Sequence, residues 1–303
     1  MQEFTEYINY CDRQFKNIAK CQDCPYGQCI HDCPDAHIKD CYSCLAKIHR
    51  RANQGKWTYQ CQKITYNYIL KHGHRYASEI DKILSLLSNE KTIQLPNEIN
   101  VASIGCGPCT ELFGVMDQFS NKTVHFKGFD WNPLWKPLTT YLGTLFPNKD
   151  NQFLDSDFFD YMEGCDLHID ILILNYMLSD MARCQTSAEC SKFIDYIIKL
   201  CDAGRITYIV INDIYLTYDM GTGYALMEEL ARKLRSDKNV FEREWRGRFA
   251  EPNEWQPQYG KKYPESLSFP ATEVVVKAYD PMQVCGSIFI LIETKPNDTQ
   301  CKS

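Results

Sequence analysis

Long apolar runs and internal repeats are missing from this chain of 303 residues. No run of about 18 apolar residues occurs, so we expect no membrane-spanning helix. The first six residues, Met-Gln-Glu-Phe-Thr-Glu, carry acid where a secretory signal carries positive charge, and no apolar segment follows them. Apolar residues make up 44% and charged residues 24%, which excludes a disordered or fibrous protein. We therefore expect an intracellular globular protein, located in the cytoplasm and without membrane contact.

Charge is distributed unevenly along the chain, although the net charge is only -6. Residues 1–76 contain 11 Lys and Arg against 7 Asp and Glu, which gives +4, and the rest of the chain contains 22 against 32, which gives -10. A mildly basic head on an acidic body is compatible with nucleic-acid contact through the head, and equally with an ordinary protein surface.

Cysteine, in contrast, is abundant: the chain has 16, and half of them fall within the first 61 residues. In a reducing compartment such a cluster more often binds metal than forms disulfides. Paired Cys-x-x-Cys units can bring two thiolates to one ion, so eight thiolates suffice for two tetrahedral zinc ions, or for one four-ligand site with spare cysteines. The candidate metal ligands are Cys11, Cys21, Cys24, Cys29, Cys33, Cys41, Cys44 and Cys61.

The type of metal is open between two alternatives. The run Cys21-x2-Cys24-x4-Cys29-x3-Cys33-Pro is similar to an iron–sulfur ligand run, but its middle spacing is longer than the usual two residues. We favour zinc, and we predict that residues 1–61 form a zinc-binding module that folds around its ion.

The remaining residues, 62–303, are predicted to form an α/β domain. Residues 62–95 have the apolar spacing of helices, with Gly73 as an interruption and Ser78 as an N-cap. From residue 100 onward, short apolar runs alternate with helical stretches, which predicts a mostly parallel sheet covered on both faces. The predicted strands are Asn100–Ile104, Val124–Phe129, Gln152–Leu154, Ile169–Leu174 and Thr207–Ile211. The predicted helices cover about 111–119, 134–145, 187–200 and 222–235.

The tail of the chain changes rhythm. Glu273–Ala278 and Ser287–Ile292 are separated by Tyr-Asp-Pro, which predicts a closing antiparallel pair. Residues 238–270 precede this pair, and we interpret them as an insertion on the substrate side of the domain. Within them, the alternation in Phe241–Phe249 predicts a strand.

A glycine-rich turn is the clearest functional pattern. The apolar strand that ends at Ile104 runs into Gly105-Cys-Gly107 and then into a helix, so the backbone can pass close to a ligand and the helix N-terminus offers unpaired N–H groups. Asp130 ends the next strand, where a carboxylate can accept hydrogen bonds from ribose hydroxyls. Asp157 follows the strand after that. This arrangement predicts a nucleotide-type ligand.

These motifs resemble those of the class I S-adenosylmethionine-dependent methyltransferases. The matching segments, in chain order from the first motif to the loop after the fourth strand, are Ile104–Leu112, Gly128–Asp130, Asp155–Phe159 and Asp170–Asp180. The resemblance covers roughly residues 62–293 and implies a Rossmann-like sheet with a closing antiparallel hairpin. Cys109 departs from the pattern, because the family often has a third glycine there. NAD-dependent dehydrogenases are the competing family, but they have no closing hairpin.

The resemblance also implies roles for individual residues. The two glycines line the methionine part of S-adenosylmethionine, the first acid binds the ribose, and the tryptophan beside it packs on the adenine. The aspartate–phenylalanine pair faces the adenine edge, and the asparagine touches the cofactor beside the substrate opening. The implied cofactor-binding residues are Gly105, Gly107, Asp130, Trp131, Asp157, Phe158 and Asn175.

The candidate catalytic residues lie after the fourth and fifth strands. Methyl transfer needs an aligned nucleophile and shelter from water, and a general base only when the nucleophile holds its proton. Asn175 and Tyr176 stand where some relatives carry Asn-Pro-Pro-Tyr, a pattern associated with methylation of exocyclic base amines, and the prolines are missing here. Asp180 and Asp213 are the candidate bases, although each taken singly is more simply interpreted as a loop cap. Cys106 and Cys109 are most simply small side chains of the turn.

The substrate is the least determined part of this prediction. Residues 47–66 and 238–263 interleave basic and aromatic side chains, a mixture suited to phosphate contact and base stacking. We therefore predict a methyltransferase that acts on a large substrate, in the first place RNA. A small-molecule or protein methyltransferase and a non-catalytic cofactor-binding protein are the alternatives.

Overall fold

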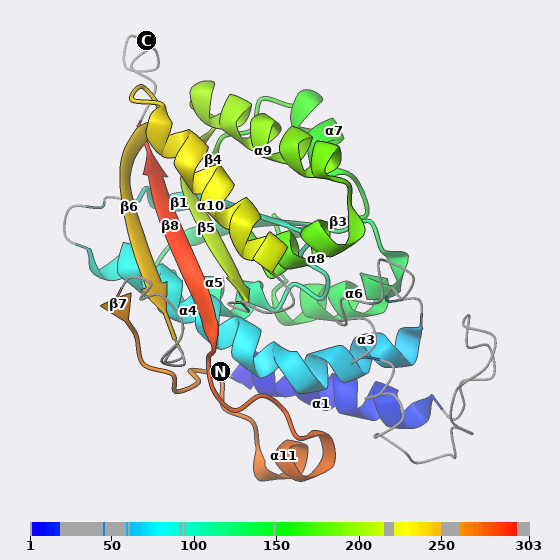
Figure 1. Cartoon of the computed structure of the whole chain (residues 1–303). Helices are drawn as coiled ribbons and strands as arrows, with labels where there is room; N and C mark the ends of the chain where they lie inside the picture. The colour runs from blue at the N-terminus through cyan, green and yellow to red at the C-terminus, as the bar shows by residue number, and fades with distance from the viewer. Residues whose placement is uncertain are drawn as a thin grey trace.

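The computed structural model describes residues 2–18, 45, 59, 61–90, 93, 95–147, 150–214, 221–249 and 261–295. Within these ranges one sheet of eight strands has the order β3-β2-β1-β4-β5-β8-β6-β7 (Figure 1). The strands are β1 (Glu98–Ile104), β2 (Thr123–Phe129), β3 (Gln152–Leu154), β4 (Ile169–Asn175), β5 (Ile206–Ile214), β6 (Phe241–Arg248), β7 (Lys261–Lys262) and β8 (Ser287–Thr294). The first five run parallel, and β8 is antiparallel to both β5 and β6. The predicted Rossmann-like α/β sheet is confirmed.

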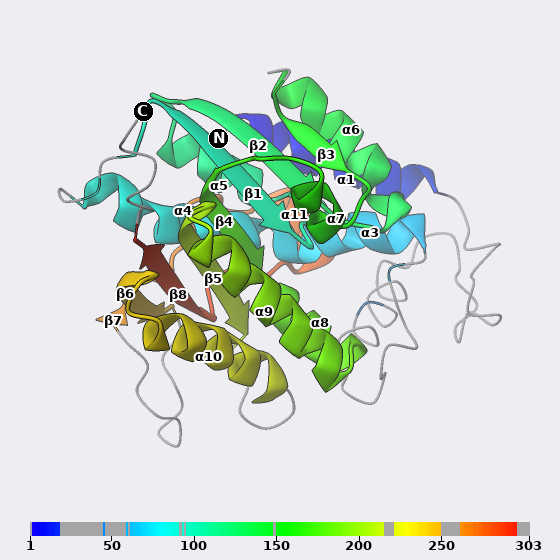
Figure 2. The same cartoon turned by 90° about the horizontal axis from the view of Figure 1, so that it is seen from above.

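Helices cover both faces of this sheet. Their bounds are α1 (Gln2–Asn17), α3 (Gln62–Tyr68), η2 (Ile69–Gly73), α4 (His74–Asn89), α5 (Glu111–Gln118), η3 (Pro133–Trp135), α6 (Lys136–Leu145), α7 (Phe158–Glu163), α8 (Met177–Cys184), α9 (Ser187–Asp202), α10 (Gly221–Ser236) and α11 (Glu273–Tyr279). Figure 2 shows α1, α3, α4, α5 and α6 on one side of the sheet and α8, α9 and α10 on the other. No helix in the described ranges is both long and apolar enough to cross a bilayer.

The central strands are buried on both sides because their side chains alternate between two cores. In β4, Ile171 and Ile173 join the core under α1, α4 and α5, whereas Leu172 and Leu174 join the core under α8, α9 and α10. A strand buried on both faces needs apolar residues at every position, which is why this segment appears in the sequence as a continuous apolar run.

The predicted break in the leading helices is wrong. Residues 62–89 form one continuous helical rod, in which η2 is a π-helical turn that contains Gly73. Ser78 lies inside α4 and is fully buried, and its hydroxyl donates to the carbonyl of His74 at 2.7 Å. It therefore cannot act as an N-cap, because its own N–H lies within the helical ladder.

The end of the chain also differs from the prediction. Glu273–Tyr279 forms the helix α11 and not a strand, because the Thr272 hydroxyl caps its N-terminus by accepting from the Val275 N–H. Val275 and Tyr279, one turn apart, supply its buried face. The antiparallel partners of β8 are β5 and β6. Residues 241–248 form a strand as predicted, and this strand pairs with β8 in the sheet.

The helix α1 belongs to the body of the domain. Phe4, Tyr7 and Phe15 are buried in the same core as the sheet, and the Tyr7 hydroxyl donates to the carbonyl of Pro108 at 3.0 Å. The module predicted over residues 1–61 stays a prediction, since most of these residues lie outside the described ranges. The amphipathic pattern of this helix was overlooked because the neighbouring cysteines dominate the segment.

Candidate functional site

The glycine-rich turn lies at the carboxyl edge of the parallel strands, directly after β1. Gly105, Gly107 and Cys109 all have positive φ angles, of 62°, 49° and 54°. A Cβ atom on Gly105 would lie 2.7 Å from Cγ of Met177, and one on Gly107 would lie 3.3 Å from the indole of Trp135. The two glycines are thus required by both backbone conformation and space.

Asp130 links this turn to the end of β2. Its Oδ2 accepts the N–H of Gly107 at 2.8 Å, and its Oδ1 accepts the N–H of Asn132 at 2.8 Å. Burial raises the pKa of this carboxyl to about 6, although both N–H bonds act in the opposite direction. Each carboxylate oxygen has a second lone pair, so Asp130 can hold the turn and still accept hydroxyl groups from a ligand.

The three residues predicted beside the adenine have different environments. Trp131 is 76% exposed and therefore accessible for stacking. Asp157 caps α7, since its Oδ1 accepts the N–H groups of Phe159 and Asp160. Phe158 is buried, and its ring meets Phe129 edge-on with centroids 5.1 Å apart. Phe158 is thus a core residue in this structure, and sequence reasoning had placed it at the ligand.

Asn175 and Tyr176 lie at the end of β4, beside the turn after β1. Tyr176 has a φ angle of 55°, is almost fully buried, and donates its hydroxyl to Glu79 at 2.8 Å. Its ring packs against Tyr76 with centroids 4.1 Å apart. The side chain of Asn175 accepts from Asn212 at 2.9 Å. The hydroxyl of Tyr176 is therefore used in a hydrogen bond within the protein. Asn175, the last residue of β4, is partly exposed at the carboxyl edge of the sheet.

The two candidate bases differ in accessibility. Asp213 is buried, and its carboxylate accepts the N–H groups of Ser179 at 2.8 Å and Ile214 at 2.7 Å, so it serves as a cap between β5 and α8. Burial raises its pKa to about 6. Asp180 is 41% exposed and pairs with Arg183 at 2.6 Å. Of the two, Asp180 is the one that a substrate could reach.

Sequence reasoning missed the residues that support this edge from below. Arg75 and Glu79 form an ion pair inside α4, at 2.8 Å, and Glu79 is completely buried. Asn212 on β5 is also completely buried and bonds both Glu79 and Asn175. The only local indication was the pair of opposite charges spaced four residues apart on α4.

Cys106 and Cys109 pack into the space left by Gly128. Their Sγ atoms are 3.0 Å apart, and a Cβ on Gly128 would lie 2.6 Å from one sulfur and 2.9 Å from the other. Burial raises the pKa of both thiols. Both cysteines thus occupy the position of small buried side chains under the turn.

The predicted metal ligands fall mostly outside the described residues. This applies to Cys21, Cys24, Cys29, Cys33, Cys41 and Cys44. Cys61 is half-buried directly before α3, and Cys11 is fully buried in the core. Burial raises the pKa of the Cys11 thiol, which disfavours the thiolate that metals bind. Across the ranges given above, no group of three or more Cys, His, Asp and Glu side chains is arranged to hold a metal.

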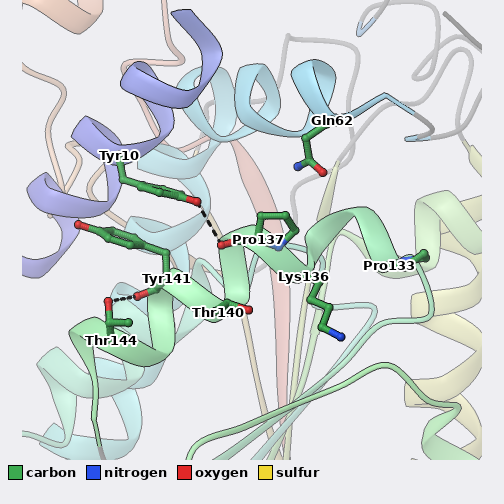
Figure 3. Close-up of a pocket in the computed structure, with 8 residues that line it drawn as sticks. All are labelled: Tyr10, Gln62, Pro133, Lys136, Pro137, Thr140, Tyr141 and Thr144. Carbon is green, nitrogen blue, oxygen red and sulfur yellow. Dashed lines mark hydrogen bonds between the residues drawn. The ribbon is translucent and has the colours of Figure 1, made fainter. Parts of the chain in front are cut away.

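A pocket of about 540 Å³ lies between α1 and α6 (Figure 3). The rings of Tyr10 and Tyr141 stack beside it with centroids 3.9 Å apart. Lys136 contributes the one charged side chain of its lining. None of the predicted cofactor or catalytic residues lines this pocket, so it is separate from the edge described above.

Glu111, at the start of α5, provides a pH-dependent prediction. It is buried, accepts a hydrogen bond from Ser103, and has its pKa raised by burial to about 7. The folded protein therefore holds a proton that the unfolded chain releases near pH 4.5, and stability falls as pH rises from there to about 7. We expect Glu111→Gln to reduce the loss of unfolding free energy between pH 5 and pH 8 by about 2 kcal/mol. Urea denaturation at several pH values measures the free energy of unfolding. If that free energy varied with pH in the same way in the variant and in the wild type, the prediction would be contradicted.

No protein-family model matches the sequence, and no curated protein matches it. Among solved structures, the plantazolicin methyltransferase BamL, in complex with a triazolic desmethylPZN analog and SAH, is 15% identical, with a TM-score of 0.48 over 84% of this chain and 99% of that one. A rRNA methylase from Streptococcus thermophilus is 12% identical, with a TM-score of 0.40 over 73% and 93%. M. capricolum TrmK, in complex with S-adenosylhomocysteine, is 12% identical, with a TM-score of 0.39 over 71% and 68%. The sheet of this chain is of the α/β Rossmann-like type, with five parallel strands followed at one side by the antiparallel strand β8 and by β6.

Proposed function

We propose that this protein is an S-adenosylmethionine-dependent methyltransferase. The observation that carries the proposal is the bond between the Gly107 N–H and Asp130, which joins the glycine turn after β1 to the acid after β2. In an open α/β sheet, ligands bind outside the carboxyl ends of the strands where the strand order reverses. In the order β3-β2-β1-β4-β5, that point lies between β1 and β4, where the turn and Asn175 are neighbours.

The residues at this edge fit the parts of the cofactor. Gly105 and Gly107 supply the positive-φ turn beside which the methionine part would lie, Asp130 has lone pairs for the ribose hydroxyls, and exposed Trp131 offers a ring face to the adenine. The free oxygen of Asp157 and the side chain of Asn175 complete the proposed set. Phe158 supports it only from the core.

When bound, S-adenosylmethionine supplies an electrophilic methyl group. The protein's own part is to exclude water, to orient the nucleophile and to take up a proton where one is released. Asp180 is the accessible carboxylate for that proton, held beside Arg183. Asp213 acts through the fold, because it is buried and caps the start of α8 through the Ser179 N–H.

RNA is the substrate we propose in the first place. Contacts of Tyr59, within the basic and aromatic segment 47–66, support this proposal: its carbonyl accepts from Asn132 at 2.8 Å, and its ring lies 5.1 Å from that of Trp135, which is next to Gly107. The segment 238–263 supports RNA contact less, because Arg243 and Arg246 of β6 are paired with glutamates. The proposed zinc site draws on the eight predicted cysteines from Cys11 to Cys61, six of which lie outside the described residues.

Calorimetric titration with S-adenosylhomocysteine tests the cofactor proposal. We expect binding by the wild type and a loss of at least about tenfold for Asp130→Ala, since hydrogen bonds to a charged group contribute roughly 1.5–3 kcal/mol each. Asp166→Ala, which removes an exposed carboxylate elsewhere, is the matched control. No binding by intact, metal-loaded wild type would refute the proposal.

Transfer of a labelled methyl group into total RNA, protein and metabolite fractions tests the substrate. Label in RNA supports the proposal, label confined to protein or metabolites favours the alternative enzymes, and binding without any transfer favours a non-catalytic protein. Metal analysis of the same preparation checks the zinc proposal, which iron and a brown colour would overturn.

A further inference from the structure

A buried chain of hydrogen bonds connects Glu79 to the candidate site. Glu79 Oε1 accepts the Nε–H of Arg75 and the N–H of Gly286, each at 2.8 Å. Its Oε2 accepts the hydroxyl of Tyr176 at 2.8 Å and the amide of Asn212 at 3.0 Å. The members come from α4, the loop before β8, the end of β4 and β5, so one carboxylate holds four separate parts of the chain.

The chemistry of this carboxylate determines the direction of every bond beyond it. An ionised carboxylate only accepts hydrogen bonds, so the Asn212 atom that faces Glu79 must be the nitrogen, Nδ2. The same Nδ2 donates its second hydrogen to Asn175, and therefore the Asn175 atom that faces inward must be the oxygen, Oδ1. The Ser287 hydroxyl donates to the Asn212 Oδ1 at 2.6 Å, which agrees with this orientation.

The orientation leaves the nitrogen of Asn175 turned away from the network. Among the described residues this nitrogen has no hydrogen-bond partner, and it is not among the buried polar atoms that lack one, so it is accessible. Asn175 is the last residue of β4, at the carboxyl edge beside the turn of Gly105 and Gly107. The side chain of Asn175 thus presents an N–H donor to a ligand at this edge, whereas its oxygen faces inward to Asn212.

We propose that Glu79, acting through Asn212, sets Asn175 as a hydrogen-bond donor, so that the site selects a ligand atom that accepts a hydrogen bond. Such an atom is a carboxylate or carbonyl oxygen or an unprotonated ring nitrogen. An amino group, which needs an acceptor, is disfavoured at this position. Glu79 and Asn212 are positioning residues, and Asn175 is a ligand-binding residue. The inference rests on the proposed function for the identity of the ligand, which comes either from the cofactor's amino-acid part or from the methyl-accepting substrate.

Two substitutions of Asn175 test the donor role. Asn175→Ala removes the donor, and Asn175→Asp keeps the inward oxygen but places an acceptor where the donor stood. We expect Asn175→Asp to be the more damaging, by at least about tenfold against wild type, because it sets an acceptor against an acceptor. Asn239→Asp, at an exposed turn, is the control for added charge. An Asn175→Asp protein that is milder than Asn175→Ala, or within twofold of wild type in both assays below, would overturn the inference.

Two probes separate the sources of the ligand atom. If the atom is the cofactor's carboxylate, Asn175→Asp weakens binding of S-adenosylhomocysteine and leaves binding of 5′-methylthioadenosine, which lacks the amino-acid part, within twofold. If the atom belongs to the substrate, affinity for S-adenosylhomocysteine is unchanged and labelled transfer into total RNA falls. Either result supports the donor role.

The role of Glu79 is tested without any ligand. NMR spectra of ligand-free wild type and ligand-free Glu79→Gln, both labelled with ¹⁵N-asparagine, are compared. We expect the side-chain amide resonances of Asn175 and Asn212 to differ between them, because glutamine, unlike an ionised carboxylate, does not require a hydrogen-bond donor from Asn212. Glu163→Gln, on the exposed end of α7, is the control. Unmoved resonances in a folded Glu79→Gln protein would remove Glu79 from the proposal. A wild type that fails to bind S-adenosylhomocysteine would refute the proposed function, and these spectra would still decide the orientation of Asn175.

Discussion

Replacing Glu79 with alanine is expected to lower the free energy of unfolding by about 3–5 kcal/mol, because it leaves the buried Arg75 without its counter-charge. The same change removes the acceptor for the Tyr176 hydroxyl, the Asn212 amide and the Gly286 N–H. Unsatisfied buried donors add to the loss. Equilibrium denaturation in guanidinium chloride, followed by circular dichroism, measures the difference.

Two further proteins make this result specific. Glu163→Ala removes an exposed glutamate and is expected to change stability by no more than about 0.5 kcal/mol. Arg75→Met in the Glu79→Ala background removes the stranded charge, and we expect it to restore part of the loss. Breaking a buried ion pair usually costs several kcal/mol of unfolding free energy. If the unfolding free energy of Glu79→Ala lay within about 1 kcal/mol of that of the wild type, the hydrogen bonds to Glu79 would not be formed in solution.

Gly105→Ala is expected to cost about 2–4 kcal/mol of stability and at least tenfold in affinity for S-adenosylhomocysteine. The φ angle of 62° disfavours any residue with a Cβ, and that Cβ would lie 2.7 Å from Cγ of Met177, the first residue of α8. Movement of Met177 would disturb the start of α8 beside Asn175. Thermal denaturation and calorimetric titration measure the two effects.

Gly143→Ala is the matched control for this substitution. Gly143 lies in α6, and its Cβ would meet only an ordinary contact, 3.8 Å from the ring of Phe153. In a helix, alanine is favoured over glycine by up to about 1 kcal/mol, so the control is expected to be neutral or slightly stabilising. Equal effects of the two substitutions would mean that the turn tolerates a side chain and does not approach the cofactor closely.

Much of the sheet was predictable because each buried strand is a short apolar segment that can be recognised in the sequence. The five parallel strands were located within two or three residues at each end, since strands covered on both faces appear as continuous apolar runs. The segment Glu273–Tyr279 misled the prediction because its valines favour strands, whereas the cap at Thr272 and the burial of Val275 and Tyr279 select a helix.

The candidate site was predictable only where chemistry and conformation coincide in one segment. Gly105, Gly107 and Asp130 were selected because a glycine turn between a strand and a helix, followed by an acid after the next strand, is typical of nucleotide-type sites, and the structure joins them by the bond from the Gly107 N–H to Asp130. Phe158 was predicted at the adenine edge and Asp213 as a candidate base or loop cap; in the structure both side chains are buried, and Asp213 accepts the N–H groups of Ser179 and Ile214. Burial of a single side chain next to a functional motif is not visible in a local pattern.

The sequence by itself determined the α/β class, the parallel strands and the glycine turn with Asp130, because each follows from a local period or a local backbone requirement. Only the tertiary structure decided that β6 closes the sheet beside β8, that α1 joins the body, and that Glu79 holds the end of β4. Glu79 lies 97 residues from Tyr176, 133 from Asn212 and 207 from Gly286 in the sequence. A local sequence pattern cannot reveal contacts between residues so far apart in the chain. These contacts form only when the folded sheet brings the ends of its strands together, where a buried carboxylate needs hydrogen-bond donors for its oxygens.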